Sequence, residues 1–226
     1  MLIESIEENI MAITLGVSVY PDQETIEQID AYLKLASSYG FTKVFTSMFS
    51  IEGNKDEVAQ YFKNFTGIAH QYGMKVSGDC NTKFLEKMGA DESNLSIFNE
   101  MGIDSIRMDL CYFDERDTKL INNSYNIGVE MSAAFIKPIA RGANIDNLVC
   151  CHNFYPERYT GADLESVMNV NNHWKEKGVK VAQFISSNVE GAHGPWPIQE
   201  GLPTMEDHRW MSVDDQVRHC LAMGNV

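Results

Sequence analysis

A short pattern recurs along this chain: a glycine follows an apparent helix, and a hydrophobic run begins a few residues later. The copies are Tyr39-Gly40-Phe41-Thr42-Lys43-Val44, Tyr72-Gly73-Met74-Lys75-Val76, Met101-Gly102-Ile103-Asp104-Ser105-Ile106, Lys177-Gly178-Val179-Lys180-Val181 and Met223-Gly224-Asn225-Val226. Glycine just past a helix adopts the left-handed conformation without strain. The run after it is typical of a buried strand. Repeated helix-to-strand junctions indicate stacked βα units and a parallel sheet.

Hydrophobic periodicity predicts seven strands with helices between most of them. The predicted strands are 15–20, 43–48, 75–79, 105–109, 126–132, 147–151 and 180–185, and the predicted helices are 24–39, 56–72, 84–88, 95–100, 164–176 and 213–223. An eighth strand would start at Val226. The predicted fold is therefore α/β, a TIM-like (β/α)8 barrel truncated at the start of strand eight. We expect residues 1–14 to be an N-terminal extension and 15–226 to be the incomplete barrel domain.

An open doubly wound sheet is the competing architecture. Such sheets usually carry a glycine-rich phosphate loop after the first strand. Here the first strand-to-helix connection reads Tyr20-Pro21-Asp22-Gln23 and contains no glycine. The barrel is the better prediction.

Composition indicates which binding partners and which cellular compartment to expect. The net charge of −14 disfavours binding to nucleic acid or to anionic membrane surfaces. No apolar run is long enough to span a bilayer, and the acidic N-terminus lacks the basic start of a secretory signal. Five cysteines without CxxC spacing are typical of reduced thiols. We expect a cytoplasmic protein, and the sequence leaves a homo-oligomer open.

The carboxyl ends of the predicted strands carry many polar residues, and in a barrel this is the end where active sites lie. They are Ser18, Tyr20, Asp22, Thr46, Ser47, Asp79, Asn81, Arg107, Asp109, Glu130, Ser132, His152, Asn153, Tyr155, Gln183 and Ser186. Any one of these carboxylates could instead cap a helix or pair with a neighbouring arginine. Arg107 and Asp109 share a face of their strand and could form a local ion pair.

Glu130 is harder to explain structurally, because it interrupts the apolar run Ile127-Gly128-Val129-Glu130-Met131. A buried charge is costly unless it is partnered or used. Adjacent strands lie about 4.8 Å apart, so Asp109 and Glu130 on neighbouring strands can approach each other. Two nearby carboxylates titrate apart, and glycoside cleavage needs such a pair. Glu130 and Asp109 are therefore a candidate pair for this chemistry.

Neither a metal nor a cofactor is predicted. The six histidines show no HxH or HExxH spacing, and His152 is expected to form hydrogen bonds rather than to bind a metal. Two long segments, 151–161 and 194–209, combine aromatic residues with histidine and arginine. Long ordered loops are usually functional, although their aromatic residues could simply pack a lid. Aromatic faces suit a sugar ring, and arginine suits phosphate.

At these residues the chain resembles the bacterial 6-phospho-N-acetylmuramidase family. The similar stretches are LGVSVYPDQ (15–23), YGFTKVFTSMFSIEG (39–53), MGIDSIRMDL (101–110), VEMS (129–132), CHNFYPERYTG (151–161) and GPWPIQEGLPTMEDHR (194–209). The resemblance implies a TIM-like barrel followed by a smaller cyclophilin-like β domain, which we expect this chain to lack. It also implies an intracellular glycosidase that recycles peptidoglycan by cleaving the 6-phospho-N-acetylmuramyl–N-acetylglucosamine disaccharide.

The resemblance and the strand-end positions together give the expected site. Glu130 and Asp109 are the predicted catalytic residues, with Asp22 as a third candidate. The expected substrate contacts are Ser18, Tyr20, Asp79, Arg107, His152, Asn153, Tyr155, Arg158, Glu206, His208 and Arg209. Two alternatives stay open: a metal-dependent sugar-phosphate isomerase or epimerase, and a non-catalytic barrel that binds a sugar phosphate. Whether the reaction retains or inverts configuration is also open, because this depends on the separation of the carboxylates.

Overall fold

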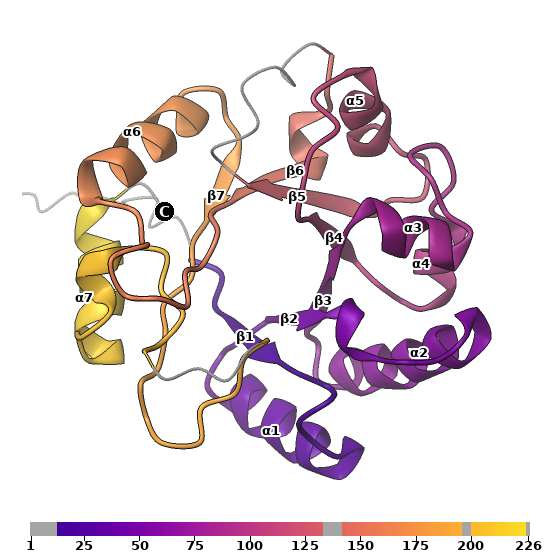
Figure 1. The fold of residues 1–226 in the computed structure, drawn as a ribbon, viewed down its shortest axis with the longest axis horizontal. Coiled ribbons are helices and arrows are strands. Elements are labelled where there is room, and N and C mark those ends of the chain that lie inside the picture. The colour runs from indigo at the N-terminus through magenta and orange to yellow at the C-terminus, as the bar shows by residue number, and fades with distance from the viewer. Residues whose placement is uncertain (1–12, 133–141, 196–199, 225–226) are drawn as a thin grey trace, which may run out of the picture.

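The computed structural model of the chain describes residues 13–132, 142–195 and 200–224. One sheet holds seven parallel strands in chain order. The strands are β1 (Gly16–Val19), β2 (Lys43–Ser47), β3 (Lys75–Cys80), β4 (Ser105–Met108), β5 (Gly128–Ser132), β6 (Leu148–Cys151) and β7 (Lys180–Ala182). The sheet curls on itself with the helices outside it (Figure 1). This confirms an α/β fold consistent with a truncated TIM barrel. Closure between β7 and β1 stays a prediction, and strand eight lies outside the described residues.

Helices connect most successive strands. They are α1 (Ile26–Ser38), α2 (Lys55–Gln71), α3 (Thr82–Met88), α4 (Ser96–Glu100), α5 (Glu115–Ile121), α6 (Leu164–Lys175) and α7 (Val213–Met223), with 3₁₀ turns η1 (Met48–Ser50), η2 (Ile145–Asn147) and η3 (Glu206–His208). The six predicted helices are confirmed within two residues at each end. In the described ranges, no helix is both long and apolar enough to cross a membrane.

Three elements differ from the predictions. Helix α5 was not predicted, because its sequence ERDTKLI is short and mostly polar, and it begins where the Asp114 side chain accepts a hydrogen bond from the Arg116 N–H. Strand β5 begins at Gly128 rather than at residue 126, since Asn126 has a left-handed φ of 59°. Strand β7 ends at Ala182 instead of residue 185.

The recurrent glycines close the helices as predicted. Gly40, Gly73, Gly102, Gly178 and Gly224 all have positive φ, between 65° and 85°. The first four are followed by β2, β3, β4 and β7. The segment after Gly224 lies outside the described residues.

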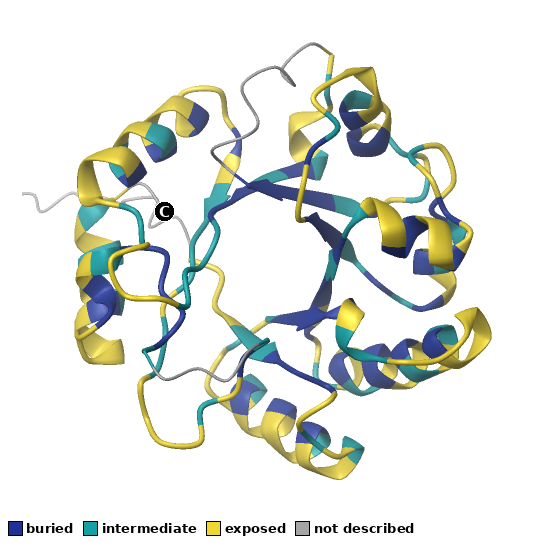
Figure 2. Cartoon of the chain, viewed as in Figure 1, coloured by how far each residue is buried: buried dark blue, intermediate teal, exposed yellow. Residues whose placement is uncertain are grey.

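Alternation along the strands divides the sheet into two faces. One set of alternate residues, including Val44, Val76, Ile106 and Val129, packs with helix residues into the hydrophobic core. Because side chains alternate along a strand, the other set faces away from the helices, toward the concave side of the sheet. Both sets are largely buried along β2 to β6, whereas the outer surfaces of the helices are exposed (Figure 2). The concave face is therefore where sheltered polar chemistry can occur.

Replacement of the recurrent glycines by alanine should show at which of them a side chain clashes with its neighbours. A Cβ at Gly102 would lie 2.7 Å from Thr66 Oγ1, whereas a Cβ at Gly40 would meet nothing within 4 Å. Both replacements force alanine to positive φ, at about 1 kcal/mol. We expect Gly102→Ala to lower the free energy of unfolding by about 2–3 kcal/mol because of the added overlap. Gly40→Ala is the matched control, and equal losses in urea unfolding would contradict the steric account.

Candidate active site

The register of three neighbouring strands sets charged side chains at one level of the concave face. Asp79 on β3 is the partner of Arg107 on β4, and Arg107 is the partner of Glu130 on β5. All three belong to the set of residues that faces away from the helices. Together with Lys43 and Ser105 they form what we call the concave-face cluster.

Glu130 is held by groups from two other strands. Its Oε1 accepts hydrogen bonds from Lys43 Nζ at 2.5 Å and from Ser105 Oγ at 2.7 Å. Lys43 lies on β2 and Glu130 on β5, so this ion pair crosses the concave face. Burial alone would raise the pKa of Glu130, but the Lys43 charge and the hydrogen bonds from Lys43 and Ser105 outweigh it and hold the pKa below its usual range. Glu130 is therefore ionised at neutral pH.

Arg107 is the buried cation at the centre of the cluster, with only 1% of its surface exposed. Its Nη1 donates to Asp79 Oδ1 at 3.0 Å, and its Nη2 donates to Asn153 Oδ1. Three rings surround the guanidinium at 5.9–6.0 Å from ring centroid to Cζ: Phe45, Phe154 and Phe184. These aromatic rings shield the cation from water, which strengthens its interaction with Asp79.

The pKa of Asp79 is shifted in the opposite direction from that of Glu130. Burial raises the pKa of Asp79 to about 6, against the opposing charge and hydrogen bond of Arg107, and the nearby Asp109 and Glu130 carboxylates add to the rise. Thus one carboxyl of the cluster titrates near neutrality and the other stays ionised. Separation of this kind is the arrangement that acid–base catalysis uses.

Tyr20 and Ser18 lie beside Asp79 at the end of β1. Burial, together with the Asp79 and Asp22 charges, raises the pKa of Tyr20 to about 12, although a hydrogen bond from Ser18 and the Arg107 charge oppose the rise. The phenol therefore keeps its proton and is a hydrogen-bond donor. Two of the predicted substrate contacts are thus brought next to the cluster.

The other two predicted catalytic carboxylates lie at the rim. Asp109 is exposed and follows β4, two residues beyond Arg107, which places it one level above Glu130. Its N–H donates to Cys80 O at 2.9 Å. Asp22 is also exposed, in the turn after β1. The charges of both Asp109 and Glu130 act on Asp79, so Asp79 lies near each of them. The pairing of Asp109 with Glu130 in catalysis stays a prediction.

His152 lies on the helix side of β6 rather than on the concave face. Its Nε2 is 2.6 Å from Asn171 Oδ1 on α6, and the residue is buried. Burial lowers the pKa of His152. The predicted contact of His152 with substrate stays a prediction.

An ion pair between buried Arg209 and partly exposed Glu206 joins the two loops that the sequence analysis singled out. Glu206 accepts hydrogen bonds from the N–H groups of Tyr159 and Gly161, both at 2.9 Å, and from Arg209 at 2.7–2.8 Å. Arg209 is fully buried and also donates to Tyr155 O at 3.0 Å. The charges of Glu206 and Arg209 therefore stabilise the loop conformation. Their predicted contact with substrate stays a prediction.

Arg158 and His208 occupy different surroundings in these loops. The Arg158 side chain is 51% exposed, forms an ion pair with Glu200 and lies 5.8 Å from the Trp210 ring centroid. His208 is fully buried, with its Nε2 2.9 Å from His219 Nδ1. Of the two predicted ligand contacts, Arg158 is the one whose charged group reaches solvent.

Sequence reasoning missed Lys43, Ser105 and the aromatic enclosure of Arg107. The alternation of KVFTS in β2 could have placed Lys43 and Phe45 on the face opposite the core. Nothing local in the sequence connects Lys43 with Glu130, which is 87 positions away.

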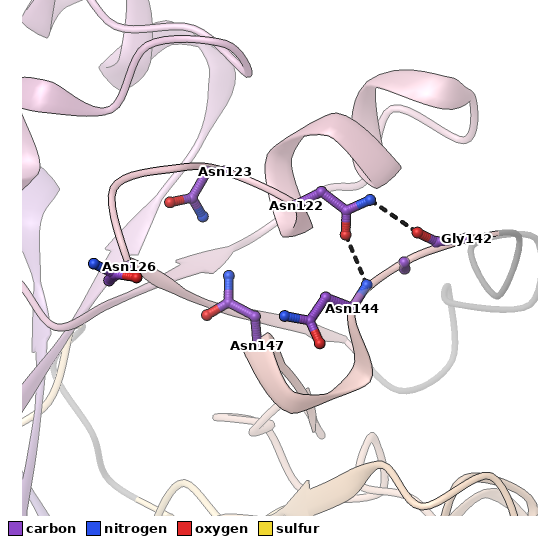
Figure 3. Close-up of a pocket in the computed structure, with 7 residues that line it drawn as sticks. Asn122, Asn123, Asn126, Gly142, Asn144 and Asn147 are labelled. Carbon is purple, nitrogen blue, oxygen red and sulfur yellow. Dashed lines mark hydrogen bonds between the residues drawn. The ribbon is translucent and has the colours of Figure 1, made fainter.

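Asparagine residues line a pocket beside α5 and η2, at the ends of β5 and β6 opposite the rim (Figure 3). Asn122 Nδ2 donates to Gly142 O at 2.8 Å, and Asn147 Nδ2 donates to Ile121 O at 2.6 Å. These amides complete loop hydrogen bonds, and the predicted site residues lie elsewhere. In the part of the chain that the structure describes, no group of three His, Cys, Asp or Glu side chains is placed to hold a metal.

Comparisons with known proteins agree with the architecture. A family model described as "6-phospho-N-acetylmuramidase, N-terminal" matches residues 15–226. The structure of an uncharacterised B. cereus protein is similar at a TM-score of 0.82 and 31% identity, over 94% of this chain and 58% of that one. A conserved Enterococcus faecalis protein of unknown function is similar at a TM-score of 0.72 and 26% identity, over 87% of this chain and 54% of that one. The chain thus spans little more than half the length of these two proteins. A search of curated proteins gives no match.

Removal of the Lys43 charge, which pairs with Glu130 across the concave face, should destabilise the fold. We expect Lys43→Met to lower the free energy of unfolding by about 3 kcal/mol, because it leaves the buried Glu130 charge without its partner. Lys75→Met is the matched control, since Lys75 is the exposed register partner of Lys43 on β3. Urea unfolding measures both variants, and a loss for Lys43→Met no larger than for the control would contradict the account.

The ion pair between Glu206 and Arg209 should make the free energy of unfolding fall at acid pH. Hydrogen bonds from Arg209, together with the Tyr159 and Gly161 N–H groups, lower the pKa of Glu206 from 4.5 to about 2 in spite of partial burial. Since the folded pKa is depressed, this stabilisation is complete above pH 4.5 and is lost as the pH falls toward 2. Glu206→Gln should be less stable than wild type at pH 7, with the difference shrinking below pH 4.5. Exposed Glu86→Gln is the control, and a pH-independent difference for Glu206→Gln would refute this origin.

Proposed function

The chain belongs to the 6-phospho-N-acetylmuramidase N-terminal family, and on that basis we propose that it is the barrel part of a glycoside hydrolase. The proposed substrate is the 6-phospho-N-acetylmuramyl–N-acetylglucosamine disaccharide released in peptidoglycan recycling. The proposed compartment is the cytoplasm, and no cofactor is invoked.

One observation carries the chemistry of this proposal. Two carboxyl groups at one level of the concave face, Asp79 and Glu130, have pKa values shifted in opposite directions around Arg107. Glycosidases use carboxyl groups in two roles, a proton donor to the leaving oxygen and an ionised group that serves as base or nucleophile. The low pKa of Glu130 suits the ionised role.

The rim carboxylates complete the proposed machinery. Asp109 is solvent-exposed one level above Glu130, where it can meet both the sugar and the attacking water. We retain Asp109 as the second catalytic carboxylate and Asp22, exposed after β1, as the third candidate. Retention or inversion depends on how these groups are spaced around the bound sugar.

Recognition of the substrate is proposed to use the loops after β6 and β7. The guanidinium of Arg158 is half exposed, and it would exchange its ion pair with Glu200 for the 6-phosphate or the lactyl carboxylate of the substrate. With a net charge of −14, the protein needs a local cation to attract such an anion. The nearby Trp210 ring suits the apolar face of a sugar.

Replacement of Glu130 by glutamine tests the proposal. The glutamine amide oxygen can still accept hydrogen bonds from Lys43 and Ser105, so the fold should persist while the charge is lost. We expect turnover of the phosphorylated disaccharide to fall at least 10²–10⁴-fold, roughly the range for a catalytic proton-transfer group. The measurement is release of N-acetylglucosamine by the intact protein, with circular dichroism as a check on folding.

Glu100→Gln is the matched control, because Glu100 is exposed at the end of α4. This variant should keep the wild-type rate. A near-normal rate for Glu130→Gln would remove Glu130 from the chemistry. A wild-type protein that does not cleave the phosphorylated disaccharide would refute the proposed function itself.

A further inference from the structure

We infer that Asp79 is the general acid that protonates the glycosidic oxygen of the leaving sugar. The sequence analysis expected Asp79 only to contact substrate. The inference rests on the proposed glycosidase function and assigns a proton donor to it.

The position of Asp79 distinguishes it from the other carboxylates of the site. Glu130 has only 4% of its side chain exposed and is committed to Lys43. Asp109 is exposed at the rim. The Asp79 side chain is 13% exposed, at the carboxyl end of β3. Its exposure is therefore intermediate between that of Glu130 and that of the rim carboxylate Asp109, so a substrate oxygen can reach a group that bulk water does not freely solvate.

Hydrogen bonds fix this carboxyl group in place. Arg107 Nη1 donates to Asp79 Oδ1 at 3.0 Å, and Asn153 holds the other side of the guanidinium. Among the described residues, the hydrogen bonds of the Asp79 side chain involve Oδ1 alone. Oδ2 is the oxygen on which a transferable proton can reside.

The surrounding charges agree with a proton donor here. Burial and the Asp109 and Glu130 carboxylates raise the pKa of Asp79 to about 6 although Arg107 opposes them. Glu130, by contrast, has its pKa lowered and cannot supply a proton near neutrality. Asp79 is thus assigned as the acid because of its position at the carboxyl end of β3 and because Glu130 is excluded as a proton donor.

The proton transfer balances with one water molecule. The Oδ2 proton moves to the glycosidic oxygen while the bond from that oxygen to the anomeric carbon breaks, and its electron pair leaves with the alcohol. Water adds its hydroxyl to the anomeric carbon and gives its remaining proton to a carboxylate of the site. The net reaction is hydrolysis, and exchange with solvent restores the proton on Asp79.

The test compares two leaving groups in the intact protein. Asp79→Asn keeps an oxygen for Arg107 but carries no acidic proton. On the phosphorylated disaccharide, whose leaving sugar needs protonation, we expect the rate to fall by about 10²–10⁴-fold. On the 2,4-dinitrophenyl glycoside of the same 6-phospho sugar, whose leaving group departs unprotonated, the loss should be less than about tenfold, because general acid catalysis contributes little there. The basic limb of the wild-type pH–rate profile should also disappear.

Asp146→Asn is the control, since Asp146 is exposed on η2, at the opposite ends of the strands. This variant should match wild type on both substrates. Equal losses for Asp79→Asn on both substrates, or no loss on the disaccharide, would overturn the assignment while leaving the proposed function standing. Wild-type protein inactive on both substrates would overturn the proposed function, and this assignment with it.

Discussion

The ion pair between Lys43 and Glu130 is the interaction on which the rest of the site depends. It joins β2 to β5 across the concave face at 2.5 Å and places a negative charge where the sheet would otherwise need apolar side chains. Without Lys43, burial would favour the protonated form of Glu130. With it, Glu130 stays ionised, and its charge in turn raises the pKa of Asp79. This cross-sheet contact thus keeps Glu130 ionised and contributes to the raised pKa of Asp79, of which burial is the largest cause.

Arg107, on the strand between those of Asp79 and Glu130, orients the Asp79 carboxyl group. It keeps Asp79 in a fixed orientation without forcing it to ionise, because burial and the neighbouring carboxylates outweigh its charge. Its aromatic enclosure joins residues of β2 and of the segments after β6 and β7 around one guanidinium. The loops are fixed separately by Arg209 and Glu206. Most of the arginines expected to bind an anion are therefore occupied inside the protein, and Arg158 is the exposed one in the loops.

The fold could be predicted from the sequence because its signals are local. Glycine at the end of a helix and alternation within a strand each extend over a few residues, and both indicate the same βα repeat. Helix α5 lacked such a signal. The site was predicted less completely, since strand ends predicted Asp79, Arg107 and Glu130 but not Lys43, which belongs to the opposite end of its strand. His152 directly follows Cys151 on β6 and its side chain lies 2.6 Å from Asn171 on α6, and its expected contact with substrate stays a prediction.

The central claim is that the concave face holds one ionised and one titrating carboxyl group. Carbon-13 NMR of the carboxyl groups in the intact protein measures this directly, with Glu130→Gln and Asp79→Asn used to assign the signals. The account predicts that the Glu130 signal stays at its ionised position from neutral pH down to below 4.5, while the Asp79 signal titrates with a midpoint of about 6. The reverse order, or coincident titration of both groups near the ordinary carboxyl pKa of about 4, would contradict it.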